Sequence, residues 1–271
     1  MKGLRSRILV GVPLAAATAA AAWVGGWVMV VLAVVAALVA QHEYSTVTHD
    51  LRPLALAGMV GSAATVITIH RGGPVWGVAA VGGTLVFAFW LSAVSDVRQR
   101  STVQLATTML GVIWIGFGFG YLVAVRDIAA PGGWGRTLAI AVLLGVWTSD
   151  IAAFAVGRLF GRRRMARRIS PNKTWEGLAA GTLLGAAAVF FTVYHQPSGA
   201  QLSPLHSLVL AVTVAVVAPV GDLFESYLKR DMDVKDTGRL LGGHGGVLDR
   251  VDALIFAGVA AYYVSLALGR G

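Results

Sequence analysis

The feature that most constrains this chain is its series of apolar runs, many of them near the roughly 20 residues that an α-helix needs to cross a bilayer. We place nine such runs, near residues 8–24, 27–40, 54–69, 74–94, 103–125, 136–157, 175–194, 205–224 and 248–268. In lipid, these runs can satisfy their backbone polar groups only as helices, because the alternating pattern of barrel strands is missing. The sequence therefore predicts an all-α, polytopic integral membrane protein with about nine transmembrane helices and polar loops.

The composition excludes several other classes of protein. Charged residues make up 13% of the chain and hydrophobic residues 56%, whereas a soluble domain carries about 25% charged residues. No cysteine is present, so disulfides, thiolate metal sites and cysteine nucleophiles are excluded. The net charge of +9 is explained better by a charge bias across a membrane than by a nucleic-acid partner, so no nucleic acid is expected.

The positions of Lys and Arg predict the topology. With nine spans and an inner amino terminus, 18 of the 22 basic residues lie on the inner side, and the four others are Arg71, Arg126, Arg136 and Arg270. Merging the first two spans across 25–26 would leave 15 inside, so we favour two spans, with the first apolar run as an uncleaved helix. We therefore expect a multi-pass protein of the cell (inner) membrane whose amino terminus and two long polar loops are cytoplasmic.

Acidic residues concentrate in one short part of the chain. Seven of the 13 lie between 222 and 252, namely Asp222, Glu225, Asp231, Asp233, Asp236, Asp249 and Asp252. The spacing of Asp222, Glu225, Ser226 and Lys229 places them on one helical face. Charges at this depth in a span are expensive, so by default they face a polar cavity and carry function. Two structural alternatives stay open: an ion pair between Asp222 and an arginine, and a carboxylate favoured by a helix dipole at Asp249.

This segment has the chemistry of a site for a metal and a polyphosphate. Carboxylates without cysteine suit a hard cation, above all Mg²⁺, which substrate phosphates normally complete. Nearby Lys and Arg would neutralise those phosphates, and the GGHGG run could present amide groups to them. His244 is either a ligand, phosphate donor or proton carrier, or a histidine of a structural turn. Asp150 adds an acidic residue near the inner end of the sixth span.

A second polar loop reads RLFGRRRMARRISPNKTWEG. Most of its arginines are typical of charges that attract anionic lipid headgroups. Pro171 and Asn172 predict a turn, Thr174 a helix cap, and Lys173 an anion site at the positive end of the next helix. The run GFGFG at 116–120 resembles a nucleotide-binding loop, but its place within an apolar helix favours close helix packing.

At these residues the sequence resembles the phosphatidate cytidylyltransferase (CDP-diacylglycerol synthase) family. The signature of that family reads S-x-x-K-R-x4-K-D, a short glycine-containing spacer, and H-G-G-x-x-D-R-x-D. The matching positions are Ser226, Lys229, Arg230, Lys235, Asp236, His244, Gly245, Gly246, Asp249, Arg250 and Asp252. Two further motifs of the family match at 149–161 and 170–177, whereas the first 100 residues match only as apolar helices. Gly242 departs from the pattern, because many members have proline there.

The resemblance implies an enzyme that makes CDP-diacylglycerol and pyrophosphate from CTP and phosphatidic acid, with Mg²⁺ and possibly a second cation, as a homodimer. It implies one membrane domain over 1–271, with amino-terminal helices at 1–100 that support, dimerise or face lipid, and a catalytic half at 136–268. The metal candidates are Asp222 and Asp249, then Asp236 and Asp150. The catalytic candidates add Lys229, Arg230, Lys235, His244 and Arg250 to Asp222, Asp236 and Asp249. The substrate-binding candidates are Lys173, Thr174, Ser226, Gly245 and Gly246.

Two other functions fit parts of the sequence. A CTP-dependent lipid kinase would use the γ-phosphate of the nucleotide and release CDP. A cation-coupled transporter would use intramembrane carboxylates, but it predicts them near the bilayer midplane and in both halves of the chain. The carboxylates here gather at the expected cytoplasmic ends of the spans and in one half only.

Overall fold

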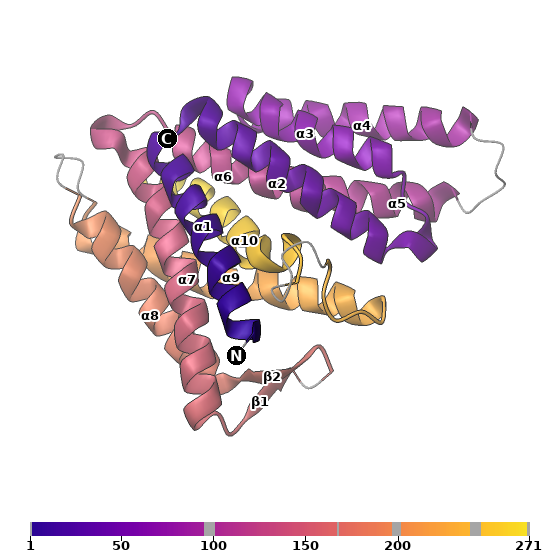
Figure 1. Cartoon of the computed structure of the whole chain (residues 1–271). Helices are drawn as coiled ribbons and strands as arrows, with labels where there is room; N and C mark the ends of the chain where they lie inside the picture. The colour runs from indigo at the N-terminus through magenta and orange to yellow at the C-terminus, as the bar shows by residue number, and fades with distance from the viewer. Residues whose placement is uncertain (1, 95–100, 167, 197–201, 239–244, 270–271) are drawn as a thin grey trace. The chain divides into compact units, whose positions relative to one another are not determined.

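The computed structural model describes residues 2–94, 101–166, 168–196, 202–238 and 245–269 (Figure 1). Its helices are α1 (Lys2–Val24), α2 (Gly26–Val47), α3 (Ala55–Gly72), α4 (Pro74–Val94), α5 (Ser101–Gly111), α6 (Phe117–Asp127), α7 (Trp134–Phe160), α8 (Trp175–Tyr194), α9 (Pro204–Asp231) and α10 (Leu248–Ala267). A π-helical segment, Val112–Gly116, joins α5 to α6, and short 3₁₀ turns lie at His49–Leu51 and Pro131–Gly133. Helix makes up 84% of the structure, which confirms the all-α prediction.

The helices follow the predicted spans closely. In the described parts of the chain, seven helices are long and apolar enough to cross a membrane: Gly26–Val47, Pro74–Val94, Ser101–Asp127, Pro131–Phe160, Trp175–Tyr194, Pro204–Asp231 and Leu248–Ala267. These helices confirm a polytopic membrane protein, while the count of nine stays a prediction. The end of the second span was predicted wrongly, because α2 continues past residue 40 to Val47. Polar side chains of its last turns, among them Glu43 and Tyr44, form hydrogen bonds within the protein, which hydropathy alone does not show.

The chain divides into two compact units. One contains the residues up to Ala124 together with Met232–Val251, and the other contains Val125–Asp231 together with the residues from Asp252 onward. We call them the amino-terminal unit and the carboxyl-terminal unit.

Close helix packing shapes the amino-terminal unit. Gly25, with a φ of 73°, separates α1 from α2, so the first apolar stretch forms two helices. A Cβ added at Gly116 would lie 3.1 Å from the backbone of Ser62 on α3, and one at Gly120 would collide with Ile69. Gly116 and Gly120 therefore let the π-helical segment and the start of α6 approach α3, which confirms the packing interpretation of this run.

In the carboxyl-terminal unit, α7 and α8 run side by side (Figure 1). Small residues permit this contact: a Cβ at Gly177 would lie 2.7 Å from the carbonyl oxygen of Ala153, and one at Gly181 would lie 2.8 Å from that of Ser149. Packing of this kind is a main source of helix association in lipid, where the hydrophobic effect does not drive helices together.

A short antiparallel hairpin connects these two helices. Its strands are β1 (Arg164–Ala166) and β2 (Ser170–Thr174). The turn predicted at Pro171 and Asn172 is wrong, because both residues lie within β2. Proline is compatible with a two-stranded ribbon, in which one side of each strand needs no ladder hydrogen bond. The predicted cap is confirmed, since Thr174 Oγ1 accepts a hydrogen bond of 3.1 Å from the backbone N–H of Gly177 at the start of α8.

A Gly181→Leu substitution should destabilise the carboxyl-terminal unit by about 1–3 kcal/mol, because the larger side chain forces α8 away from α7. We expect a melting temperature several degrees lower in detergent, measured by the fluorescence of the eight tryptophans. The matched control is Gly82→Leu on α4, where an added Cβ meets no atom within 4 Å. Equal melting temperatures for the two variants would contradict close packing at Gly181.

Candidate active site

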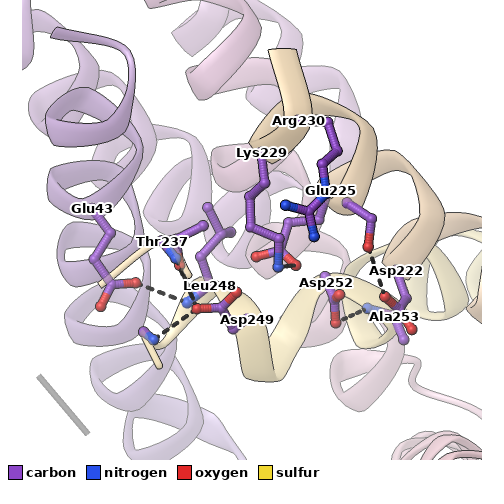
Figure 2. A network of polar contacts seen from close by, with 12 residues as sticks. Glu43, Asp222, Glu225, Lys229, Arg230, Thr237, Leu248, Asp249, Asp252 and Ala253 are labelled. Atoms are coloured by element: carbon purple, nitrogen blue, oxygen red, sulfur yellow. Dashed lines mark hydrogen bonds and ion pairs between the residues drawn. The ribbon is translucent and has the colours of Figure 1, made fainter. Parts of the chain in front are cut away.

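One face of α9 carries the polar residues that the sequence placed together. The hydroxyl of Ser226 donates a hydrogen bond of 3.4 Å to Asp222 Oδ1, one helical turn away. Lys229 Nζ donates one of 2.7 Å to Glu225 Oε2, and the side chain of Glu225 is 2% exposed (Figure 2). The predicted face is therefore present, and a buried carboxylate on it is matched by a lysine of the same helix.

The β-hairpin contacts this face of α9. Lys173 Nζ of β2 lies 2.6 Å from Asp222 Oδ2, and Arg230 Nε donates a hydrogen bond of 3.2 Å to the carbonyl oxygen of Ile169. Asp222 thus forms an ion pair, as one alternative predicted, but its partner is a lysine of the second polar loop instead of an arginine. The structure therefore brings together Asp222 and Lys173, which are 49 positions apart in the sequence.

Asp252 adds a third carboxylate to this part of the carboxyl-terminal unit. Its side chain, on the second turn of α10, is 7% exposed and has Glu225 and Asp222 as acidic neighbours. Asp252 Oδ1 also accepts a hydrogen bond of 2.7 Å from the N–H of Ala253. Neither Glu225 nor Asp252 was among the predicted site residues, although the former shares the helical face with Asp222 and the latter completes the family signature.

In the amino-terminal unit, Asp249 fastens the polar segment that precedes α10. Its Oδ2 atom accepts three hydrogen bonds: 3.0 Å from the N–H of Thr237, 2.9 Å from the hydroxyl of Thr237, and 2.8 Å from the N–H of Gly246 (Figure 2). Asp249 lies in the first turn of α10, where a carboxylate is favoured by the helix dipole. Asp249 is therefore a carboxylate at a helix amino terminus, as the structural alternative predicted, and its Oδ2 atom accepts hydrogen bonds from the loop.

Glycine is required at one position of this segment. Gly245 has a φ of 77°, and a Cβ there would lie 2.6 Å from Asp249 Oδ2. The unusual dihedral expected of the GGHGG run is present at Gly245. The N–H of the next residue, Gly246, is bonded to Asp249 and so faces a carboxylate of the protein.

Glu43, which was not among the predicted site residues, also contacts this segment. Glu43 is 3% exposed, although it lies in the spanning helix α2. Its carboxylate accepts a hydrogen bond of 3.0 Å from the N–H of Val247 and one of 2.9 Å from the N–H of Leu248 (Figure 2). A weak signal was available, because only three acidic residues occur before residue 125, and this one directly follows an apolar run.

The other predicted site residues are more dispersed. Lys235, Asp236 and Arg250 are exposed residues of the amino-terminal unit, and Asp150 is an exposed residue of α7 in the carboxyl-terminal unit. His244 lies outside the described residues. Over the part of the chain that is described, no three His, Cys, Asp or Glu side chains are grouped so as to hold a metal ion by themselves.

These helices and clusters are those of a multi-pass membrane protein that carries carboxylates and basic residues in contact with one another. Comparison with known proteins identifies the family, because the Cytidylyltransferase family profile matches residues 5–268. Phosphatidate cytidylyltransferases of Mycobacterium bovis and Brucella suis are each 31% identical to this chain, over 97% of it and over 88% and 93% of their own lengths. That of Bacillus subtilis is 36% identical over 57% of the chain and 56% of its own length. The chain belongs to the cytidylyltransferase family and is a nucleotidyltransferase.

Proposed function

We propose that this protein transfers CMP from CTP to phosphatidic acid, which gives CDP-diacylglycerol and pyrophosphate in a Mg²⁺-dependent reaction. The observation that carries the proposal is the ion pair between Lys173 and Asp222, because it brings the family motif at 170–177 to Asp222, which is hydrogen-bonded to Ser226, the first residue of the signature. The names of relatives that cover 97% of the chain supply the two substrates.

In this reaction a phosphate oxygen of phosphatidic acid attacks the α-phosphorus of CTP. A bond forms between that oxygen and the α-phosphorus, and the bond from the α-phosphorus to the oxygen that bridges to the β-phosphorus breaks, so pyrophosphate leaves. The lipid phosphate is already anionic at neutral pH and needs little help from a general base. The barrier comes from repulsion between anions and from charge that builds on the leaving group, so catalysis depends on positioning and on electrostatic stabilisation.

The basic residues of the signature are suited to this task. We assign Lys229, Arg230, Lys235 and Arg250 to the triphosphate, because guanidinium and ammonium groups form short, charge-assisted hydrogen bonds with phosphate oxygens. Lys173 would contact a phosphate of the nucleotide or of the lipid. Thr174, whose hydroxyl caps α8, would position Lys173 at the amino-terminal end of that helix, where the dipole favours anions.

The donor chemistry of the acidic residues fits Mg²⁺. This ion prefers carboxylate oxygen and commonly takes only one or two carboxylates, with water and substrate phosphates as its other ligands, so a closed cage of protein ligands is not required. Asp222, whose side chain is 37% exposed, and Asp249, in the first turn of α10, are the carboxylates that we assign to it. Asp236 and Asp150 remain second candidates. When bound, the ion would neutralise charge on the phosphates.

We further propose that the site faces the cytoplasm of a cell whose inner membrane holds the protein, since CTP is cytoplasmic and phosphatidic acid resides in the bilayer. The distribution of Lys and Arg supports this orientation. We also propose a homodimer on the basis of the family resemblance, with the helices of residues 1–100 as the candidate contact.

The test uses purified protein in detergent with phosphatidic acid, Mg²⁺ and CTP labelled at the α-phosphorus. We expect the label in the lipid fraction, pyrophosphate in solution, and loss of both signals when EDTA removes the metal. Recovery on adding Mg²⁺ back is the control for damage by the chelator. Label that stays in soluble CDP while a lipid alcohol becomes phosphorylated would establish a kinase instead. Folded protein that turns over no nucleotide would overturn the proposal and favour a transporter.

A further inference from the structure

A buried carboxylate on α2 holds the start of α10. Both oxygens of Glu43 are engaged there: Oε1 accepts from the N–H of Val247 at 3.0 Å, and Oε2 from the N–H of Leu248 at 2.9 Å. The first N–H groups of a helix have no partner within that helix, so they need acceptors from elsewhere. Glu43 supplies two of these acceptors to α10 from a position about 200 residues earlier in the sequence.

The surroundings of Glu43 are shaped to fit its carboxylate. Cβ atoms added at Gly238 and Gly246 would collide with Glu43 Oε1 and Oε2, respectively. Glycine at both positions therefore lets the backbone on either side of residues 239–244 approach the same side chain. Asp249 also accepts hydrogen bonds from the N–H groups of Thr237 and Gly246. The carboxylates of Glu43 and Asp249 therefore both contact the residues on the two sides of 239–244.

A carboxylate that is 3% exposed in a spanning helix is costly unless it has hydrogen-bond partners. Here its partners are two backbone N–H groups of the residues that directly precede Asp249 and Arg250. The side chains of Asp249 and Arg250 leave the first turn of α10, so the direction in which they project depends on how that turn begins. Glu43 is bonded to the two residues at this beginning, Val247 and Leu248.

We propose that Glu43 is a positioning residue for nucleotidyl transfer, which acts through the first turn of α10 to orient Asp249 and Arg250. This inference rests on the proposed function, because those two residues are assigned there to the metal and to the triphosphate. It assigns a role in the reaction to the amino-terminal helices, in which the family signature has no residue.

The experiment compares Glu43→Gln with Gln41→Leu. A glutamine at position 43 keeps the size of the side chain but replaces one acceptor with an N–H donor, so one of the two N–H groups loses its partner. Gln41 lies two positions earlier on α2, is fully buried and accepts a hydrogen bond of 3.2 Å from Ser62 on α3. Gln41→Leu therefore removes a buried polar contact from the same helix without touching the start of α10.

We expect Glu43→Gln to exchange the amide hydrogens of Val247 and Leu248 at least about tenfold faster, measured by mass spectrometry on peptides that cover 245–250. We expect kcat to fall by about a hundredfold, in line with small errors of positioning, and by far more than KM for CTP changes. Gln41→Leu should lower the melting temperature without changing the amide exchange of Val247 and Leu248 or the value of kcat. Glu43→Asp, which keeps both acceptors but is shorter, should recover part of the lost kcat.

Two results would overturn the inference. One is unchanged exchange at Val247 and Leu248 in Glu43→Gln. The other is a loss of kcat in Gln41→Leu that matches the loss in Glu43→Gln, since this would indicate a general effect of stability. If the wild-type protein turns over no CTP, the proposed function fails, and the exchange experiment still decides whether Glu43 holds the start of α10.

Discussion

Asp222→Asn should reduce CMP transfer by about a hundredfold or more while the protein still inserts into the membrane and purifies normally. The substitution keeps the size of the side chain but removes its negative charge, which pairs with Lys173 across 2.6 Å and which we assign to Mg²⁺. Loss of a charged group that stabilises the transition state commonly costs a factor of about 10² to 10³ in turnover. The measurement is transfer of label from CTP to lipid, at saturating substrates and with Mg²⁺ titrated.

Asp231→Asn is the matched control for this variant. Asp231 is the last residue of α9, is exposed, and occupies a variable position of the family signature. We expect it to retain activity within about twofold of the wild type, since exposed charges away from a site contribute little. Equal activity in Asp222→Asn and the wild type would remove Asp222 from the site.

Asp249→Asn should cause a loss of similar size, together with a change in the loop that Asp222→Asn does not produce. In the structure, one oxygen of Asp249 accepts three hydrogen bonds from Thr237 and Gly246. An amide accepts them more weakly than a carboxylate does, because hydrogen bonds to charged groups are about twice as strong. We therefore expect activity to fall by about a hundredfold, and the amides of Thr237 and Gly246 to exchange faster with solvent.

Asp236→Asn provides the comparison for Asp249→Asn. Asp236 is exposed and belongs to the same polar segment. The three hydrogen bonds from Thr237 and Gly246 go to Asp249 and not to Asp236. We expect it to leave the exchange of the Thr237 and Gly246 amides unchanged, whatever its effect on turnover. Wild-type turnover in Asp249→Asn, with faster exchange at the loop, would leave Asp249 a purely structural role.

Much of the candidate site could be predicted from the sequence, because the patterns that indicate it involve residues close together in the chain. The helical face of Asp222, Glu225, Ser226 and Lys229 follows from the period of the α-helix alone. Thr174 as a cap and the glycines at 116–120 as packing positions also depend on near neighbours in the chain, and the structure confirms both. The turn at Pro171 was predicted wrongly, because its conformation depends on pairing with β1.

The class of the protein follows from its amino-acid sequence alone, since apolar runs of this length can satisfy their backbone polar groups only as helices in lipid. The family follows from it too, through fixed residues at short spacings. Contacts between residues far apart in the chain became known from the folded structure. There, Lys173 pairs with Asp222, and Glu43 of α2 lies against the N–H groups of Val247 and Leu248. The spacing of neighbouring residues does not predict such pairs. A charged side chain removed from water needs a partner, and folding determines which distant group comes within hydrogen-bond distance.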